Sequence, residues 1–469
     1  MLNSLILALT GGALTHGALA NDALTTEALA PSARSVARPA SASPEQKSRA
    51  KKQTKKAVTW DVSARTKEKL HAYGAALAIT PDVDGDDVQD VLVGAPCLGT
   101  DEPGYADLLS GATGKRIARF EGEQAGDEFG FAVAAGCDLD RNGQVEMVIG
   151  ARAAAGGGAR RGTVLVIDSR SLKPIRTISG TENHGFFGEA LCCPGDVDRD
   201  GRGDLLVGAP GAAGARGHVL LFNGPELQPK QTLRGKSHGE LFGSGISGLR
   251  DLNGDGAADF GVCAPLAGSR LPNSGCFVAY SGQTLRPLRS LYGPESMSWF
   301  GISAVNPGDL DGDEVDDFLV GAPATSLGEL GGVGWVGSFS GASGDPIALY
   351  AGQNQGDFFG RSLSAGFDWN GDGIGDWAVG APFAEGKRTS KRAGYVAVRS
   401  GAGSGPELKR FEGSEEGGLL GLSLATALPG TAGSASLLAG APGRTGSAFR
   451  DTEQDREETS KPGYLRRFL

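Results

Sequence analysis

The sequence lacks the residues and motifs on which most enzymes and nucleic-acid-binding proteins depend. Histidine occurs only five times in 469 residues, and neither a G-x-S-x-G nor an H-E-x-x-H motif is present. The net charge of −10 argues against nucleic acid as a partner. No run of 18 apolar residues follows the N-terminal segment, so we expect no transmembrane segment in the mature chain.

Cysteine is also scarce, but the number is even, which is compatible with an oxidising compartment. The absence of a C-x-x-C pair disfavours a zinc ribbon. Six cysteines allow 15 disulfide connectivities. We expect Cys263 to pair with Cys276, because the two would lie on neighbouring strands of one hairpin. The six residues are Cys97, Cys137, Cys192, Cys193, Cys263 and Cys276.

The N-terminal segment predicts export. Residues 1–20 contain an apolar stretch and end in Ala18-Leu19-Ala20, a small-x-small pattern typical of signal-peptide cleavage sites. An uncleaved N-terminal anchor is the alternative. Residues 21–56 are rich in Ala, Ser, Pro, Lys and Arg and predict a disordered linker. We therefore expect a secreted, extracellular protein, or a periplasmic or cell-surface one in a bacterium.

Glycine is abundant, at 77 of 469 residues, roughly twice the usual ~7%. A collagen-like Gly-X-Y period is absent, and recurring apolar runs favour many short strands joined by tight turns. From residue 57 onward one unit repeats, with an aromatic-Gly pair, an acidic loop and then Gly-Ala-Pro or a variant. The acidic loops begin at Asp82, Asp138, Asp196, Asp251, Asp309 and Asp368, which are 56, 58, 55, 58 and 59 residues apart by subtraction.

Each of the first six units contains four strand-like runs, and the seven units together predict an all-β, seven-bladed β-propeller over residues 57–469. A helical solenoid is disfavoured because no segment keeps a 3.6-residue period. The seventh unit lacks the acidic loop and has only three strands. We expect the run Ala57–Ser63 to supply its fourth strand, which closes the ring and removes an open sheet edge.

The acidic loops share the spacing D-x-[DN]-x-[DN]-x-x-x-[DE], which predicts metal sites. Side chains at positions 1, 3, 5 and 9 and the carbonyl at position 7 would converge on one point. Oxygen ligands in a flexible loop favour Ca²⁺ over Mg²⁺ or zinc. We expect up to six Ca²⁺ ions, at most one in each loop. The loops are not EF-hands, because position 12 is apolar. The alternative is that the acids only cap turns, but so many close carboxylates would repel one another. The predicted ligands are Asp82, Asp84, Asp86, Val88, Asp90, Asp138, Asp140, Asn142, Gln144, Glu146, Asp196, Asp198, Asp200, Arg202, Asp204, Asp251, Asn253, Asp255, Ala257, Asp259, Asp309, Asp311, Asp313, Val315, Asp317, Asp368, Asn370, Asp372, Ile374 and Asp376.

Two of these loops, the second and the third, have sequence features that the other loops lack. In the second loop, Asn142 and Glu146 alter the pattern, so its calcium binding is left open. The third loop contains the tripeptide Arg202-Gly203-Asp204, which could be taken for an adhesion ligand. The other loops lack the Arg-Gly pair but keep the carboxylate that aligns with Asp204. We therefore interpret Asp204 as a cation ligand.

The combination of Phe-Gly, acidic loop and Gly-Ala-Pro, repeated along residues 57–469, resembles the FG-GAP repeats of the integrin α-subunit propeller. The resemblance implies cations in the loops between the first and second strands of the blades. It also implies that partners bind the opposite face. The leg domains and membrane span of an integrin have no counterpart here, so a receptor role is not implied.

We therefore predict a non-enzymatic interaction or adhesion module that binds an extracellular protein or glycan. Its variable loops after Gly-Ala-Pro are where recognition is expected, and one of them carries a basic cluster. A lectin-like propeller is the alternative, and a hydrolase that uses His184 and His238 is a weaker one. The basic cluster is Lys387, Arg388, Lys391 and Arg392.

Overall fold

The structure is a computed structural model. It describes residues 61–63, 71–98, 101–155, 159–224, 226–268, 271–324, 332–386, 392–427, 436–443 and 464–468. The chain divides into two units, Met1–Val58 and Thr59–Leu469, and every described residue belongs to the second. The predicted signal peptide and linker therefore lie outside the described residues.

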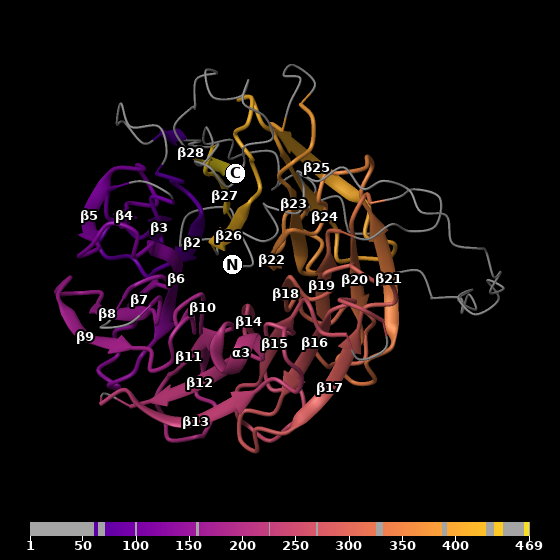
Figure 1. The fold of residues 1–469 in the computed structure, drawn as a ribbon. Coiled ribbons are helices and arrows are strands. Elements are labelled where there is room, and N and C mark those ends of the chain that lie inside the picture. Colours follow the sequence, from indigo (N-terminus) through magenta and orange to yellow (C-terminus); the bar gives the residue numbers. More distant parts are fainter. Residues whose placement is uncertain are drawn as a thin grey trace, which may run out of the picture. The chain divides into compact units, whose positions relative to one another are not determined.

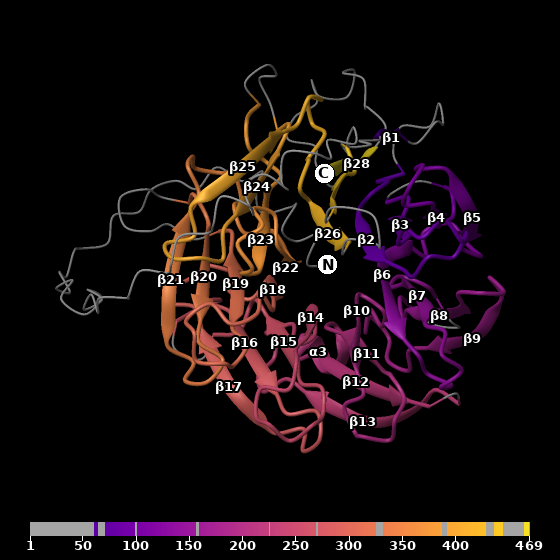
Figure 2. The same ribbon diagram turned by 180° about the vertical axis from the view of Figure 1, so that it is seen from behind.

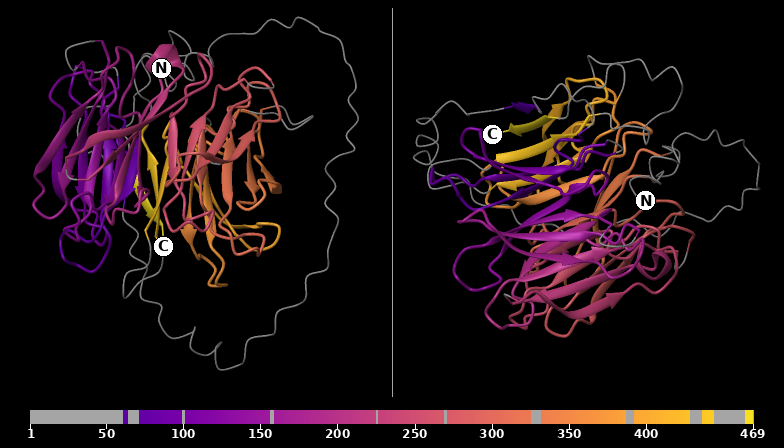
Figure 3. Two further views of the ribbon diagram at one scale, coloured as in Figure 1. Left: turned by 90° about the horizontal axis from the view of Figure 1, so that it is seen from below. Right: turned by 60° about the vertical axis from the view of Figure 1, so that its left-hand side comes forward.

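The second unit is a ring of seven four-stranded antiparallel sheets, so the predicted seven-bladed β-propeller is confirmed (Figure 1). In blades 1 to 6 the four strands follow one another in sequence, and the first strand of each blade contacts the first strand of the next around the ring. Figure 3 shows the sheets packed side by side around the ring. Blade 1 consists of β2 (Ala76–Ile79), β3 (Val91–Ala95), β4 (Tyr105–Leu109) and β5 (Arg116–Glu121), and blade 2 consists of β6 (Phe129–Cys137), β7 (Glu146–Ala151), β8 (Thr163–Asp168) and β9 (Pro174–Ser179). Blade 3 consists of β10 (Ala190–Gly195), β11 (Asp204–Ala209), β12 (His218–Asn223) and β13 (Gln228–Arg234), with the short helix α3 (Ala212–Ala215) before β12.

The remaining blades repeat this order. Blade 4 consists of β14 (Gly245–Gly248), β15 (Phe260–Ala264), β16 (Cys276–Tyr280) and β17 (Pro287–Tyr292), and blade 5 consists of β18 (Ser303–Val305), β19 (Phe318–Ala322), β20 (Trp335–Phe339) and β21 (Pro346–Ala351). Blade 6 consists of β22 (Ser362–Phe367), β23 (Asp376–Ala381), β24 (Tyr395–Arg399) and β25 (Glu407–Glu412). Blade 7 contains β26 (Ser423–Ala427), β27 (Ser436–Ala441) and β28 (Tyr464–Phe468). The second strand of every blade is buried along its whole length. Neighbouring blades cover both of its faces, which explains its continuous apolar sequence.

The N-terminal strand closes the ring, as predicted. β1 (Asp61–Ser63) pairs antiparallel with β28, which makes it the outermost strand of the seventh blade (Figure 2). Asp61 faces Arg466 in the register, and their side chains form an ion pair of 2.7 Å. The first strand of the unit and the last are thus joined in one sheet, so the outer edge of β28 is paired.

The Phe-Gly and Gly-Ala-Pro motifs meet at the contact between blades. A Cβ atom on Gly150 would lie 2.2 Å from the carbonyl oxygen of Gly188, the glycine of the next blade's Phe-Gly pair. Corresponding contacts recur at five other junctions, including Gly440 of blade 7 against Gly74 of blade 1. The glycines therefore permit a backbone approach that a side chain would block, and the adjacent aromatic rings are buried.

The predicted disulfide between Cys263 and Cys276 is wrong. Cys263 pairs with Phe277 across the strands, so the two cysteines are one residue out of register and belong to opposite faces of the sheet. Neither is disulfide-bonded. Instead, Cys137 and Cys193 form a disulfide with a Cα–Cα distance of 5.1 Å. It joins the first strands of blades 2 and 3, immediately before their acidic loops.

Candidate metal sites

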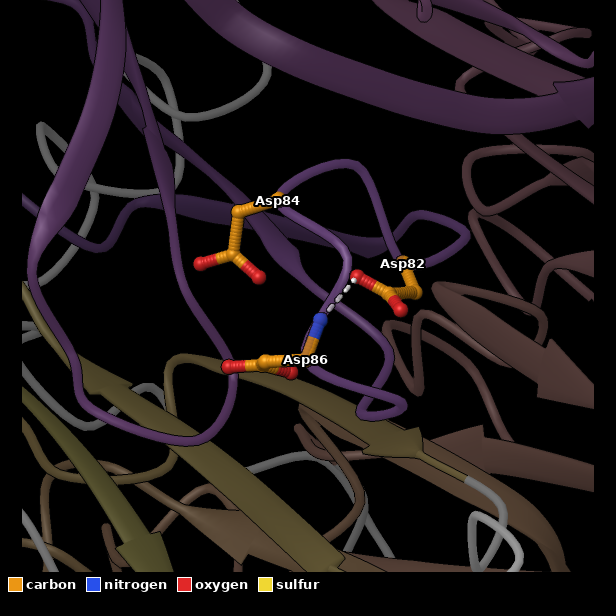
Figure 4. A group of neighbouring side chains, drawn as sticks. All are labelled: Asp82, Asp84 and Asp86. Carbon is orange, nitrogen blue, oxygen red and sulfur yellow. Dashed lines mark hydrogen bonds between the residues drawn. The ribbon is translucent and has the colours of Figure 1, made fainter.

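The six acidic loops join the first and second strands of blades 1 to 6, as predicted. In blade 1 the loop runs from Asp82 to Asp90, between β2 and β3. The carboxylate of Asp82 accepts backbone N–H groups from Gly85 at 2.6 Å, Asp86 at 3.1 Å and Asp87 at 2.7 Å. Figure 4 shows this loop curling around Asp82. Position 1 therefore organises the turn, and the other loops repeat most of these bonds.

The curl requires left-handed backbone at positions 4 and 6 of every loop. Glycine occupies most of these positions, but Arg141 and Arg199 occupy position 4 of loops 2 and 3. Asp87 and Glu314 occupy position 6 of loops 1 and 5. A non-glycine residue there costs about 1–2 kcal/mol, so the loop geometry is imposed by the surrounding blade.

The position-9 carboxylates are fully buried, with no exposed surface. One oxygen of each accepts the backbone N–H of position 2 at 2.6–2.8 Å. In four blades the second oxygen accepts the N–H of a glycine in the outer hairpin, at 2.9–3.0 Å. In blades 2 and 3, Oε1 of Glu146 and Oδ1 of Asp204 have no hydrogen-bond partner. Because Asp204 is buried, Arg202-Gly203-Asp204 is not an accessible adhesion tripeptide.

Burial of these carboxylates shifts their titration. It raises the pKa of Asp90 and Asp317 to about 6, and the pKa of Glu146 and Asp204 to about 7. Backbone hydrogen bonds offset part of the effect, and the neighbouring acids of each loop add to it. Repulsion among the ionised carboxylates of each loop therefore adds to the desolvation penalty, and a bound cation would offset both.

Three loops bring at least three carboxylates to one point, with one oxygen from each lying within 4.8 Å of the others. The remaining loops have an asparagine at position 3 or 5, which offers an oxygen but no charge. The donor sets consist of oxygen atoms, which fits a hard cation. The three carboxylate groups are Asp82, Asp84 and Asp86 in loop 1, Asp196, Asp198 and Asp204 in loop 3, and Asp309, Asp311 and Asp317 in loop 5.

The outer hairpin, which joins the third and fourth strands of each blade, adds contacts to the loop that were not predicted from the sequence. Ser110 donates to Oδ2 of Asp86 at 3.2 Å, and Ser281 donates to Oδ2 of Asp255 at 3.3 Å. The signal was visible in the repeat, because Ser-Gly follows the third strand in blades 1, 4, 5 and 6. Position 5 of the loop is therefore held by the hairpin as well as by its own loop.

The histidines considered for catalysis lie in loops that join successive blades, as expected. His184 precedes β10 and His238 precedes β14, and both are exposed. His238 contacts Arg216 at 3.2 Å, and its Nδ1 lies 3.4 Å from the carbonyl oxygen of Gly214. Among the described residues, no hydrogen bond or ion pair joins either histidine to a carboxylate. In the described part of the chain, neither His184 nor His238 is therefore held by a carboxylate group in the way that orients a general base.

The basic cluster expected on the partner face is largely outside the described residues, which include only Arg392. Its guanidinium lies 5.7 Å from the ring centre of Phe383, in the loop after the Gly-Ala-Pro of blade 6. Lys387, Arg388 and Lys391 lie outside the described residues. In the described part of the chain, no helix is long and apolar enough to cross a membrane.

Comparison with known proteins agrees with these blade contacts and acidic loops. The FG-GAP repeat family model matches residues 192–222. Integrin alpha-5 of Xenopus laevis is 30% identical over 240 residues, which cover 48% of this chain and 23% of the relative. Integrin alpha-8 of Homo sapiens is 30% identical over 190 residues, with coverages of 37% and 17%. Integrin alpha-IIb of Mus musculus is 34% identical over 183 residues, with coverages of 35% and 17%.

The chain thus contains an FG-GAP repeat and is similar to integrin α subunits. The matched segments span only about a fifth of the length of these relatives.

Proposed function

We propose that this protein is a secreted, calcium-binding propeller that acts as a non-enzymatic interaction or adhesion module. The observation that carries the proposal is the buried position-9 carboxylate, which recurs beside further loop acids in six blades. A buried anion with like-charged neighbours is unfavourable unless a cation or a proton neutralises it. Six repeats of this arrangement favour selection for an ion over six coincidental turns.

Calcium fits the loops better than other common ions. The predicted ligands are carboxylate, amide and carbonyl oxygens on a loop of nine residues, and none is histidine or cysteine. Zinc and copper prefer nitrogen and sulfur ligands, and Mg²⁺ requires a tighter octahedron. Extracellular calcium sites have dissociation constants of about 10⁻⁴–10⁻³ M, so they would be filled outside a cell.

The loops on the opposite end of the blades are the proposed recognition surface. They follow the second strand of each blade or join one blade to the next, and their sequences differ from blade to blade. Calcium would stiffen the ring without touching these loops, so that the recognition loops keep fixed relative positions. The partner would be an extracellular protein or glycan.

Isothermal titration with CaCl₂ tests the metal sites. We expect binding in the 10⁻⁴–10⁻³ M range, and we expect Asp313→Asn in loop 5 to remove one ion. Asp345→Asn is the control, because this acid lies in an outer hairpin and not in an acidic loop. A chain that binds no calcium would refute the proposal. For the interaction role, immobilised protein should retain extracellular protein or glycan from a defined array in calcium and release it in chelator.

A cavity between blades 2 and 3 supports the lectin-like alternative. It has a volume of about 340 Å³ and is lined by Arg161, Glu182, His218 and Arg234 together with apolar side chains. His218 is only 5% exposed, its Nδ1 lies 3.4 Å from Oε1 of Glu182, and its Nε2 has no hydrogen-bond partner. Burial lowers the pKa of His218, while Glu182 opposes this effect. The arginines that line the cavity suit an acidic sugar.

A glycan array that includes uronate sugars would test this alternative. The variant Thr232→Trp would fill the cavity, because Thr232 is exposed on β13 and lines it. The variant His238→Ala, outside the cavity, is the control. Uronate binding that Thr232→Trp abolishes would establish the lectin function. The absence of any glycan ligand would leave the protein-binding module as the function.

A further inference from the structure

The third acidic loop contains a positive charge that belongs to the chain itself. The ammonium of Lys230 contacts Oδ2 of Asp198, the carboxylate at position 3 of this loop. The side-chain N–H of Asn223 donates to the same oxygen at 3.0 Å. A second positive group, the guanidinium of Arg202, lies 3.9 Å from Oδ2 of Asp200 at position 5. Among the described residues, no other acidic loop has an ion pair at position 1, 3 or 5.

The repeat shows that Lys230 is an exception. In blades 1 to 6 the fourth strand contains a β-bulge, where one residue has no cross-strand partner. Lys230 is that residue in blade 3. In the five other blades the residue is aliphatic: Ile117, Ile175, Leu288, Ile347 and Leu408. The backbone position is the same throughout, so the difference lies in the side chain and its charge.

The outer hairpin of blade 3 also differs from most blades at a second position. The residue at the start of this hairpin is serine in blades 1, 4, 5 and 6, Asp168 in blade 2 and Asn223 in blade 3. Its amide and the ammonium of Lys230 converge on one oxygen of Asp198, whose side chain is only 12% exposed. Both donors therefore reach the position-3 carboxylate from the outer hairpin of the blade.

We propose that Lys230 takes the place of the calcium ion in the third loop, so that this loop stays formed without calcium. This inference rests on the proposed calcium binding of the other loops. The carboxylates of Asp196, Asp198 and Asp204 converge, and an ammonium at Asp198 compensates their charge. A calcium ion and the ammonium carry like charges and need the same carboxylate. Calcium must therefore displace Lys230 before it can bind there.

The third loop would then belong to a sector of the ring that holds together without calcium. The disulfide between Cys137 and Cys193 ties the strands that lead into loops 2 and 3. Arg199, at position 4 of loop 3, donates to the backbone carbonyl of Asp255 in loop 4 at 3.0 Å. Removal of calcium would loosen the loops of the other blades and leave the loop of blade 3 in place.

Ion counting by native mass spectrometry, with the full chain in about 2 mM calcium, above typical extracellular dissociation constants, tests the inference. Lys230→Leu introduces the residue that blades 4 and 6 have at this bulge, and we expect it to bind one more ion than the wild type. Lys115→Leu, an exposed lysine in the outer hairpin of blade 1, is the charge control and should add none. In the chain that keeps Lys230, Asp200→Asn should leave the number of bound calcium ions unchanged, whereas Asp313→Asn should lower that number by one.

The result that overturns the inference is loss of an ion on Asp200→Asn in the wild type, or no gain on Lys230→Leu. Failure of the proposed function looks different, because the wild type and Asp313→Asn would then both bind no calcium. Hydrogen exchange provides a second measurement. After chelation, backbone amides of loop 5 should exchange faster while those of loop 3 keep their rate. Equal acceleration in both loops would also overturn the inference.

Discussion

Calcium removal is the perturbation for which the structure predicts the largest effect on stability. A site with a dissociation constant of 10⁻⁴–10⁻³ M at about 2 mM calcium stabilises the folded state by about 0.6–1.8 kcal/mol. The five loops other than the third would together contribute about 3–9 kcal/mol by the same relation. The unfolding entropy of the unit Thr59–Leu469, at about 2.1 cal/mol/K per residue, is about 0.8–0.9 kcal/mol/K. Chelation should therefore lower the melting midpoint by about 4–11 °C.

Differential scanning calorimetry at pH 7.5, with calcium and with excess EDTA, measures this shift. Magnesium at the same concentration should restore less of the midpoint than calcium does, because Mg²⁺ demands near-ideal octahedral geometry and dehydrates reluctantly. Asp313→Asn should reduce the shift by about a fifth of its size, since one of five similar sites is lost. A midpoint that does not change on chelation would refute the account of the loops as ion sites.

Three further predictions concern the ion-free protein, the disulfide and the blade contacts. Burial raises the pKa of Asp204 from 3.8 to about 7, so in EDTA this group favours the folded state most below pH ~4, and the contribution is lost as the pH rises through 7. Melts in EDTA should therefore show a lower midpoint at pH 8 than at pH 5.5, and a higher one would contradict this. Replacing both Cys137 and Cys193 by Ser, which opens a loop with a sequence separation of 56 residues, should cost about 4 kcal/mol in denaturant unfolding; an unchanged midpoint would disprove it. Gly150→Ala should destabilise by about 1–3 kcal/mol, because its Cβ meets a backbone oxygen of the next blade at 2.2 Å. Gly268→Ala, whose Cβ has only ordinary contacts, is the matched control and should be near neutral.

Much of the fold could be predicted from the repeat. Acidic loops 55 to 59 residues apart, each followed by an apolar run, define the first and second strands of the blades, and the turn residues that follow define the others. The three-strand seventh unit and the isolated run at Ala57–Ser63 predict ring closure, which the pairing of Asp61 with Arg466 confirms. These features are local in sequence, or they follow from the rule that a sheet edge must be paired.

Other features of the candidate sites could not be predicted in this way. The disulfide prediction failed because cross-strand register decides which face of a sheet a cysteine occupies, and Cys263 and Cys276 are one residue out of register. The cysteine that does pair with Cys137 lies on the next blade, and a repeat pattern carries no information on the distance between blades. His218 was overlooked for a similar reason, since its partner Glu182 comes from the loop that joins blades 2 and 3.

The sequence by itself determined the number of blades, the closing strand and the positions of the acidic loops, because each depends on periodicity within one chain segment. Only the tertiary structure decided which oxygens are buried, which cysteines pair and where Lys230 lies. These outcomes depend on the packing of one hairpin or blade against another. The aspartate of Arg202-Gly203-Asp204 illustrates both levels. Alignment of the repeats assigns Asp204 to position 9 of a loop, and the packing of blade 3 buries it completely.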